Sequence, residues 1–501
     1  GAIRTAYRLY EIRGDERYLE EIFEFSDGSK QQVLSQLIHE DEAQSFAGIP
    51  DSLTAYERDL KTKLAAVRER IDQNLENPDA DKGARSVLED SAFTLNRSLQ
   101  DHISFLEQRY PRYHDFKFSE RSPDFDRLRG QLQEHNITLI EYFWSEDSLW
   151  GIVINNQGLH VKPLEADSID DRAILTFNEA VEKAKGREYL RSGHRLYQTL
   201  VEPVAEYLET DRLLIIPDGA LHLLPFEALL TERPQLPTGE PDYTALPYLI
   251  TDYQISYSAS ARTLELEGKS RRSYEYDFAG FAPVFSSSPE RIQRDSERTP
   301  WISLASLPSS RFELEEIAGV FENERGMWQM LTGSRAAQIF LQEEATEQAF
   351  KSIESADYRY IHLATHSFTD DSLSSRSGIY FHPDEENRND GILRPHEIFN
   401  LSLDAELVVL SACDTGTGTV VRGEGIVGLS RAFQYAGAQN LLVSLWKVDD
   451  RATARLMINF YESVAEHTSL AESLRKAKQE LIARTPYSAP RYWSSFSLIG
   501  Y

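Results

Sequence analysis

The sequence predicts an α/β protein with a mostly parallel sheet flanked by helices and preceded by an α-helical region. Two observations lead to this prediction. Charged residues with apolar residues at helical spacing fill the first part of the chain, and short apolar segments alternate with amphipathic ones in the remainder. Apolar strands bounded by amphipathic helices are typical of a parallel sheet that is covered on both faces.

The first region, residues 1–115, is expected to consist of amphipathic helices. Leu60, Leu64, Val67 and Ile71 recur at the three- and four-residue spacing of one helix face. The segment GDERYLEEIFEFSDGSKQQVL resembles the end of a tetratricopeptide array, although a second full copy of about 34 residues is missing. A plain helical bundle is the alternative, and both interpretations stay open.

Residues 116–270 are expected to form a first α/β half. The segment ITLIEYFWSEDSLWGIVINNQGLHVKPL contains three apolar runs separated by polar turns, which predicts a meander of strands. A helical stretch from about residue 168 to 207 follows, and then an apolar strand that ends in Pro-Asp-Gly.

Residues 271–501 are expected to form a second α/β half, with a polar boundary segment over residues 268–307. Helices are expected near 313–321 and 347–353, with a strand near Trp328 between them. Further strands are expected in YRYIHLATH, AELVVLSAC, NLLVSLW and YWSSFSLIGY, and helices in GEGIVGLSRAFQYAG, DRATARLMINFYESVAEH and SLAESLRKAKQELIAR.

The composition argues against several classes of partner. With 81 acidic and 53 basic residues, the net charge of −28 repels the phosphates of nucleic acids and anionic membrane surfaces. A single cysteine cannot form an internal disulfide and is compatible with a reducing cytosol. The sequence has no apolar run of about 18 residues and no signal-peptide core at its start, so we expect a cytoplasmic protein.

Two of the expected strands end in reactive residues, His366 and Cys413. Ligand sites of open α/β sheets lie beyond the carboxyl ends of the strands. If neighbouring strands carry these residues, the imidazole and the thiol would face each other as a nucleophilic pair requires. The turn DTGTG after the cysteine would expose the sulfur and point backbone N–H groups at an oxyanion. An inert, buried cysteine is the alternative.

His362 lies four residues before His366 and is interpreted as a structural neighbour. The pair has the histidine spacing of a zinc-binding helix, but Leu363 occupies the position of the required glutamate. The HLATH motif therefore does not predict a zinc site, and the expected cysteine–histidine chemistry requires neither a metal nor an organic cofactor.

Several segments resemble the CHAT domains, which are caspase-like cysteine peptidases related to separase and often attached to tetratricopeptide repeats. The matching segments are IIPDGALHLLPFEALL, YIHLATHS, DGILRPHEIFNLSLDAELVVLSACDTGTG, GEGIVGLSRAFQYAGAQNLLVSLWKVDD and YWSSFSLIGY. Together they cover the chain from about residue 211 to its end.

The resemblance implies a role for each matched residue. Cys413 would be the nucleophile and His366 its general base or thiolate partner. The backbone N–H groups of Cys413 and Ser367 would form the oxyanion hole, with Ser367 in the place of the family's usual glycine.

The resemblance also implies a substrate groove. The main chain of Ser444, Leu445, Trp446 and Lys447 would pair with an extended peptide. Asp414, Asp449 and Asp450 would form an acidic pocket for a basic P1 side chain. Helix capping is the alternative role for Asp449 and Asp450.

At the level of the whole chain, the resemblance implies an inactive caspase-like half in residues 116–270 and an active one in residues 271–501. The expected function is a cysteine endopeptidase that cleaves a specific protein partner in bacterial defence or regulated cell death. The alternative is a catalytically silent or latent scaffold that binds a protein partner through the helical region.

Overall fold

The computed structural model describes the chain with gaps. The described ranges are residues 2–37, 82–109, 124–145, 148–165, 169–261, 274–283, 307–323, 335–353, 358–368, 377–383, 389–411, 424–447 and 449–500, with single positions at 264 and between 53 and 67. The chain divides into two compact units, Gly1–Gln32 with Ser122–Tyr501 and Val33–Arg121.

The unit Val33–Arg121 is helical where it is described, and its longest element is α5 (Lys82–Arg109). Leu60 and Leu64, both from the predicted apolar stripe, are buried together with Leu99 of α5. Ile71 of the same stripe lies outside the described residues.

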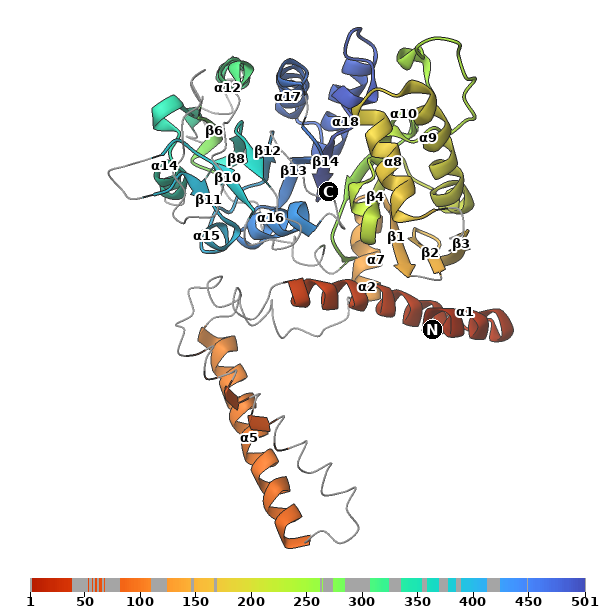
Figure 1. The fold of residues 1–501 in the computed structure, drawn as a ribbon, viewed down its shortest axis with the longest axis vertical. Helices are drawn as coiled ribbons and strands as arrows, with labels where there is room; N and C mark the ends of the chain where they lie inside the picture. Colours follow the sequence, from red (N-terminus) through yellow and green to blue (C-terminus); the bar gives the residue numbers. More distant parts are fainter. Residues whose placement is uncertain are drawn as a thin grey trace. The chain divides into compact units, whose positions relative to one another are not determined.

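The larger unit contains one sheet of 11 strands within the described residues, in the order β3-β2-β1-β4-β5-β14-β13-β12-β8-β6-β7 (Figure 1). The strands are β1 (Ile137–Ser145), β2 (Ser148–Ile154), β3 (Leu159–Leu164), β4 (Arg212–Ile216), β5 (Gln254–Tyr257), β6 (Tyr276–Ala282), β7 (Arg335–Leu341), β8 (Tyr358–Leu363), β12 (Leu407–Leu410), β13 (Asn440–Ser444) and β14 (Phe496–Ile499).

The sheet confirms the predicted fold class. The strands β1, β2 and β3 form the expected antiparallel meander, and β13 pairs with β14 in antiparallel fashion; the other neighbours in the sheet are parallel. The strand expected near Trp328 lies outside the described residues.

Helices cover both faces of the sheet (Figure 1). One apolar core is formed with α8, α9, α12, α17 and α18, and another with α1, α2 and α7. Among the described residues, the helices that lie wholly or mostly in this unit are α1 (Ala2–Arg13), α2 (Arg17–Leu37), α7 (Phe125–Glu134), α8 (Asp171–Glu182), α9 (Gly186–Leu200), α10 (Leu249–Asp252), α12 (Pro308–Asn323), α14 (Glu347–Ser352), α15 (Pro395–Phe399), α16 (Glu424–Tyr435), α17 (Asp450–Ala465) and α18 (Leu470–Ile482), with short 3₁₀ turns between them.

Helix α2 is tied to the rest of the α/β unit by buried polar groups as well as by apolar contacts, whereas α1 contributes apolar contacts. Lys30 Nζ of α2 donates to Glu141 Oε1 of β1 at 2.6 Å, and Asp27 Oδ1 accepts the backbone N–H of Ala261 at 2.8 Å. Residues 1–32 therefore belong to the α/β unit, and the helical region expected over residues 1–115 is divided between the two units.

The two predicted halves share this one sheet, and they meet where β5 lies beside β14. These strands are parallel, with Ile499 opposite Tyr257. Because β14 is antiparallel to β13, the strands β1, β4 and β5 run opposite to β13, β12 and β8. The predicted boundary near residue 270 falls outside the described residues and stays a prediction.

Candidate active site

The strands that lead to His366 and Cys413 are direct neighbours. β8 and β12 are parallel, with Leu363 opposite Leu410, and the backbone N–H of Ser411 donates to Leu363 O at 3.1 Å. His366 follows Leu363 by three residues, and Cys413 follows Leu410 by three residues. The two chains therefore leave the same edge of the sheet from paired positions.

The backbone around His366 is held on both sides. The N–H of Ala364 donates to Phe281 O at 2.9 Å, and the carbonyl of His366 accepts the N–H of Tyr380 at 2.9 Å. The hydroxyl of Thr365 donates to Tyr380 O at 2.6 Å. His366 is only 3% exposed. The imidazole is thus mounted on a rigid turn, as a catalytic side chain requires, and little of it reaches the solvent.

Ser367 begins β9 (Ser367–Phe368), which pairs with β10 (Gly378–Tyr380) in a small sheet completed by β11 (Ile392–Leu393). Ser367 lies opposite Ile379 and has the extended backbone of a strand. A serine in this position therefore requires no left-handed backbone. Along an antiparallel ladder, residues whose backbone groups bond to the partner strand alternate with residues whose backbone groups point away from it. The N–H of Tyr380 donates to His366 O, so the N–H of the next residue, Ser367, is directed away from β10.

Cys413 and Asp414 lie outside the described residues. The distance between the sulfur and the imidazole, and the oxyanion role of the Cys413 N–H, therefore stay predictions.

The segment Ser444–Lys447 leaves the carboxyl end of β13, the next strand along the same edge. Ser444 lies opposite Phe496, and the N–H of Leu445 donates to Ser495 O at 2.8 Å. The side chains of Ser444, Leu445 and Trp446 are buried, whereas Lys447 is exposed. The Leu445 N–H is already used within the protein, so pairing with a peptide would fall to Trp446 and Lys447.

Asp449 and Asp450 both make helix-end contacts. Asp449 caps α17, because its Oδ1 accepts the N–H groups of Arg451 and Ala452, each at 3.1 Å. Asp450 Oδ2 accepts the N–H of Ser309 at the start of α12 at 2.8 Å. The capping alternative thus describes what Asp449 does here, while a role of either residue in binding substrate stays a prediction.

His362 is fully buried among the helices on one face of the sheet. Its Nε2 lies 2.8 Å from Glu313 Oε1 of α12, and its Nδ1 lies 3.4 Å from the hydroxyl of Tyr461 of α17. Burial raises the pKa of Tyr461 well above its ordinary value, so this hydroxyl keeps its proton. These contacts fit the interpretation of His362 as a structural residue. Glu313 had no signal in the sequence, because it comes from a helix about 50 residues upstream.

Among the described residues, no group of three or more His, Cys, Asp or Glu side chains is placed to hold a metal ion. Within the same ranges, every helix is too short or too polar to cross a membrane.

The comparisons with known proteins agree with the region that the sequence singled out. The family model of the CHAT domain matches residues 190–501. Human tetratricopeptide repeat protein 28 is 24% identical over an alignment of 323 residues, and the match covers 58% of this chain and 12% of that protein. The mouse protein of the same name is 36% identical over 109 residues, 22% of this chain and 4% of that protein. The chain thus spans a small part of the length of these relatives.

Solved structures with some similarity include separase in the Saccharomyces cerevisiae separase-securin complex. It has a TM-score of 0.40 at 10% identity, over 100% of this chain and 44% of that one. The Arg-specific cysteine proteinase gingipain R has a TM-score of 0.35 at 6% identity, over 67% of this chain and 74% of that one.

Proposed function

The chain belongs to the CHAT domain family, and from this premise we propose that it is a cysteine endopeptidase of the caspase and separase type that cleaves a specific protein partner. One observation carries the proposal. Leu363 lies opposite Leu410 on adjacent parallel strands, and in the sequence His366 follows Leu363 and Cys413 follows Leu410 by three residues each. A pair that is proposed to act on one carbonyl group needs two segments that leave one sheet edge together in this way.

The proposed reaction proceeds in two steps. The Cys413 thiolate attacks the peptide carbonyl, and the backbone N–H groups of Cys413 and Ser367 stabilise the oxyanion. The imidazolium of His366 then gives its proton to the leaving amine, which leaves a thioester on Cys413. In the second step His366 takes a proton from water and the hydroxide attacks the thioester, so that the acid product leaves and the Cys413 thiolate and the His366 imidazolium are regenerated. This chemistry requires neither a metal nor an organic cofactor.

The direction of the Ser367 N–H supports its oxyanion role, because the small sheet leaves it pointing away from β10. The substrate would lie as an extended chain along Trp446 and Lys447. Since Asp449 and Asp450 already accept backbone N–H groups, a preference for a basic P1 residue would depend mainly on Asp414.

The decisive experiment compares cleavage by the wild type with that of Cys413→Ala and His366→Ala variants on a susceptible protein. Both substitutions should abolish cleavage while the circular dichroism spectrum is unchanged. His467→Asn is a matched control, because His467 is exposed and its φ of 63° is one that asparagine tolerates. Full activity in either alanine variant would remove the assignment.

The burial of His366 favours a second candidate, a latent form that is opened by a partner on the helical region. A thiol-directed covalent reagent distinguishes the two states, because Cys413 is the single cysteine. Slow labelling of the isolated protein and fast labelling after a partner is added would support latency. Labelling that is equally fast with and without the partner contradicts it. Labelling that stays slow in both conditions would favour a catalytically silent scaffold.

The family resemblance also suggests the setting of bacterial defence or regulated cell death, in which a companion protein is the substrate. Incubation of the protein with the products of neighbouring genes, followed by mass spectrometry of the fragments, tests this extension. Fragments that appear with the wild type and are missing with Cys413→Ala would identify the substrate. If no neighbouring product is cut, the companion-protein proposal is wrong.

A further inference from the structure

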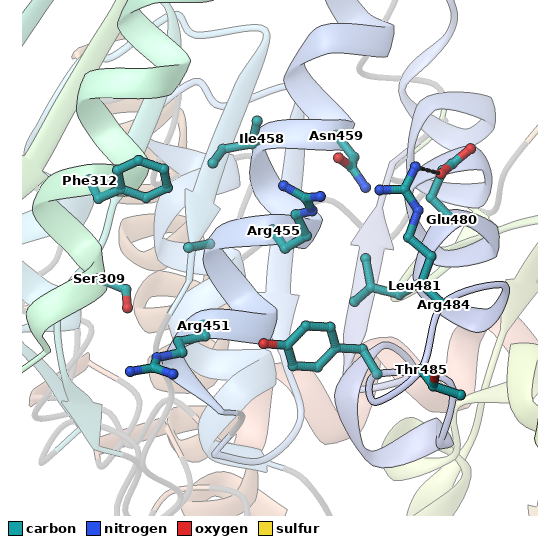
Figure 2. Close-up of a pocket in the computed structure, with 12 residues that line it drawn as sticks. Ser309, Phe312, Arg451, Arg455, Ile458, Asn459, Glu480, Leu481, Arg484 and Thr485 are labelled. Atoms are coloured by element: carbon teal, nitrogen blue, oxygen red, sulfur yellow. Dashed lines mark hydrogen bonds and ion pairs between the residues drawn. The ribbon is translucent and has the colours of Figure 1, made fainter.

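A groove of about 330 Å³ lies between α12, α17, the end of α18 and the turn that follows α18 (Figure 2). α17 follows the segment Ser444–Lys447 closely in the chain, and Asp449 between them is the N-cap of α17. The groove therefore starts close to the candidate active site. Figure 2 shows Arg451 and Arg455 on successive turns of α17, with Phe312 to one side and Arg484 to the other.

The groove carries positive charge in a protein whose net charge is −28. Three arginines line it, and Arg484 Nη2 is paired with Glu480 Oε2 at 2.8 Å. Arg451 and Arg455 are exposed, and neither guanidinium forms an ion pair or hydrogen bond with a described residue. Two adjacent cations are therefore available to a ligand with negative charge.

Apolar side chains lie beside these cations. Ala454, Ile458 and Leu481 are buried in the floor of the groove. Phe312 is 55% exposed at its edge, and Tyr487 contributes a second ring. The lining therefore combines charge with an apolar strip, which fits a peptide better than a lone inorganic anion.

The spacing of the arginines indicates the pattern of such a peptide. Residues four apart on a helix have their Cβ atoms about 5–6 Å apart. Alternate residues of an extended chain lie on one side, about 6.6 Å apart. Two acidic residues separated by one residue would therefore face Arg451 and Arg455, and an apolar residue two positions further would lie over Ile458.

We propose that the groove between α12, α17 and α18 binds an extended acidic peptide segment of a partner protein, with the pattern acidic-x-acidic-x-apolar. Arg451 and Arg455 would bind the two carboxylates, and Ile458, Leu481 and Phe312 would contact the apolar side chain. Because the groove begins beside Ser444–Lys447, the bound segment would belong to the protein substrate and would hold it near Cys413. This last role rests on the proposed peptidase function.

The test measures fluorescence anisotropy of the peptide Gly-Glu-Ser-Glu-Ser-Leu-Gly carrying fluorescein. The wild type should bind it, and the affinity should fall as salt rises to about 1 M, where the Debye length is about 3 Å. The double variant Arg451→Gln, Arg455→Gln should bind about tenfold more weakly, as expected for the loss of two exposed ion pairs. Arg172→Gln, at an exposed position of α8, is the matched control and should bind as the wild type does.

A charge reversal sharpens the test. The variant Arg451→Glu, Arg455→Glu should lose the acidic peptide and should bind Gly-Lys-Ser-Lys-Ser-Leu-Gly instead. The proposal is overturned if the wild type shows no saturable binding, or if the double glutamine variant binds equally well. Displacement of the peptide by inorganic phosphate, at constant ionic strength, would assign a simple anion site and would also overturn it.

The same measurements on Cys413→Ala separate the two proposals. Peptide binding that survives in a variant without cleavage supports both the groove and the peptidase. Cleavage that persists in Cys413→Ala would sink the peptidase alone, and a missing effect of the arginine variants would sink the groove alone.

Discussion

The buried ion pair at the junction of the two halves provides the sharpest stability prediction. Lys478 Nζ of α18 donates to Glu227 Oε1 at 2.8 Å and to Phe496 O at 2.6 Å, and the hydroxyl of Tyr257 donates to Glu227 Oε2 at 2.6 Å. Lys478 and Glu227 are 0% and 1% exposed. In Lys478→Met, which keeps much of the side-chain volume, Glu227 would remain as a buried charge without its cation.

Breaking one partner of a buried pair costs about 3–5 kcal/mol. The unit that contains the junction has about 400 residues, and at about 2.1 cal/mol/K per residue its unfolding entropy is close to 0.85 kcal/mol/K. Lys478→Met should therefore lower the Tm of this unit by about 4–6 °C. Lys476→Met is the control, because Lys476 is exposed on the same helix, and its effect should stay below about 0.5 kcal/mol.

The double variant Lys478→Met, Glu227→Gln tests the electrostatic explanation. Glutamine removes the buried charge and can still accept the Tyr257 hydroxyl, so the double variant should regain at least about 2 kcal/mol relative to Lys478→Met. Differential scanning calorimetry on the three variants and the wild type measures this coupling. If the double variant melts at or below the temperature of Lys478→Met, the pair is not coupled through charge and the reasoning fails.

Two further predictions concern pH and backbone conformation. Burial raises the pKa of Glu141 to about 7 from 4.5, although Lys30 opposes the shift. The folded state therefore holds the proton of Glu141 more tightly than the unfolded state, and the free energy of unfolding should fall by about 3 kcal/mol as the pH rises from about 4.5 to 7. Glu141→Gln should lack this fall. If the melting temperatures of the wild type and the variant change with pH in the same way, the prediction is wrong. Gly437 has a φ of +108°, and an added Cβ would lie 2.9 Å from the Asp404 backbone nitrogen, whereas the helical Gly319 has open space. Measured by urea unfolding, Gly437→Ala should lower the free energy of unfolding by about 1–3 kcal/mol, and Gly319→Ala should raise it by up to about 1 kcal/mol. Equal changes in the two variants would refute this reasoning.

The predictions that succeeded from sequence rest on periodic patterns. The meander β1-β2-β3 follows from three apolar runs with polar turns between them, and the strands β8 and β12 follow from the apolar runs in YRYIHLATH and AELVVLSAC. That β8 and β12 are neighbours is a condition of the expected pair, and the sheet supplies it. Such runs are buried because of their own composition, so they can be recognised without knowledge of their partners. The register of Leu363 with Leu410 depends on the packing of the whole sheet, and no local pattern contains it.

The contacts that could not be predicted join segments far apart in the chain. Glu227 and Lys478 are 251 residues apart, and each would be expected on the surface by residue type alone. The groove combines α12 with α17 and the end of α18, so Phe312 and Arg455 become neighbours only through the fold. Asp449 is the opposite case, because an aspartate before a helical segment is a local capping signal.

The segment Arg491–Phe496, which ends with the first residue of β14, connects the stability of the junction with the proposed substrate strand. Ser495 O accepts the N–H of Leu445, Arg491 O accepts the indole N–H of Trp446 at 3.4 Å, and Phe496 O accepts Lys478. Contacts of one short segment thus hold both the junction and the start of Ser444–Lys447. We therefore expect Lys478→Met to raise the KM for a peptide substrate. We also expect hydrogen exchange at the Leu445 amide to become faster in this variant. An unchanged KM together with unchanged exchange at Leu445 would show that the junction and the substrate strand are independent.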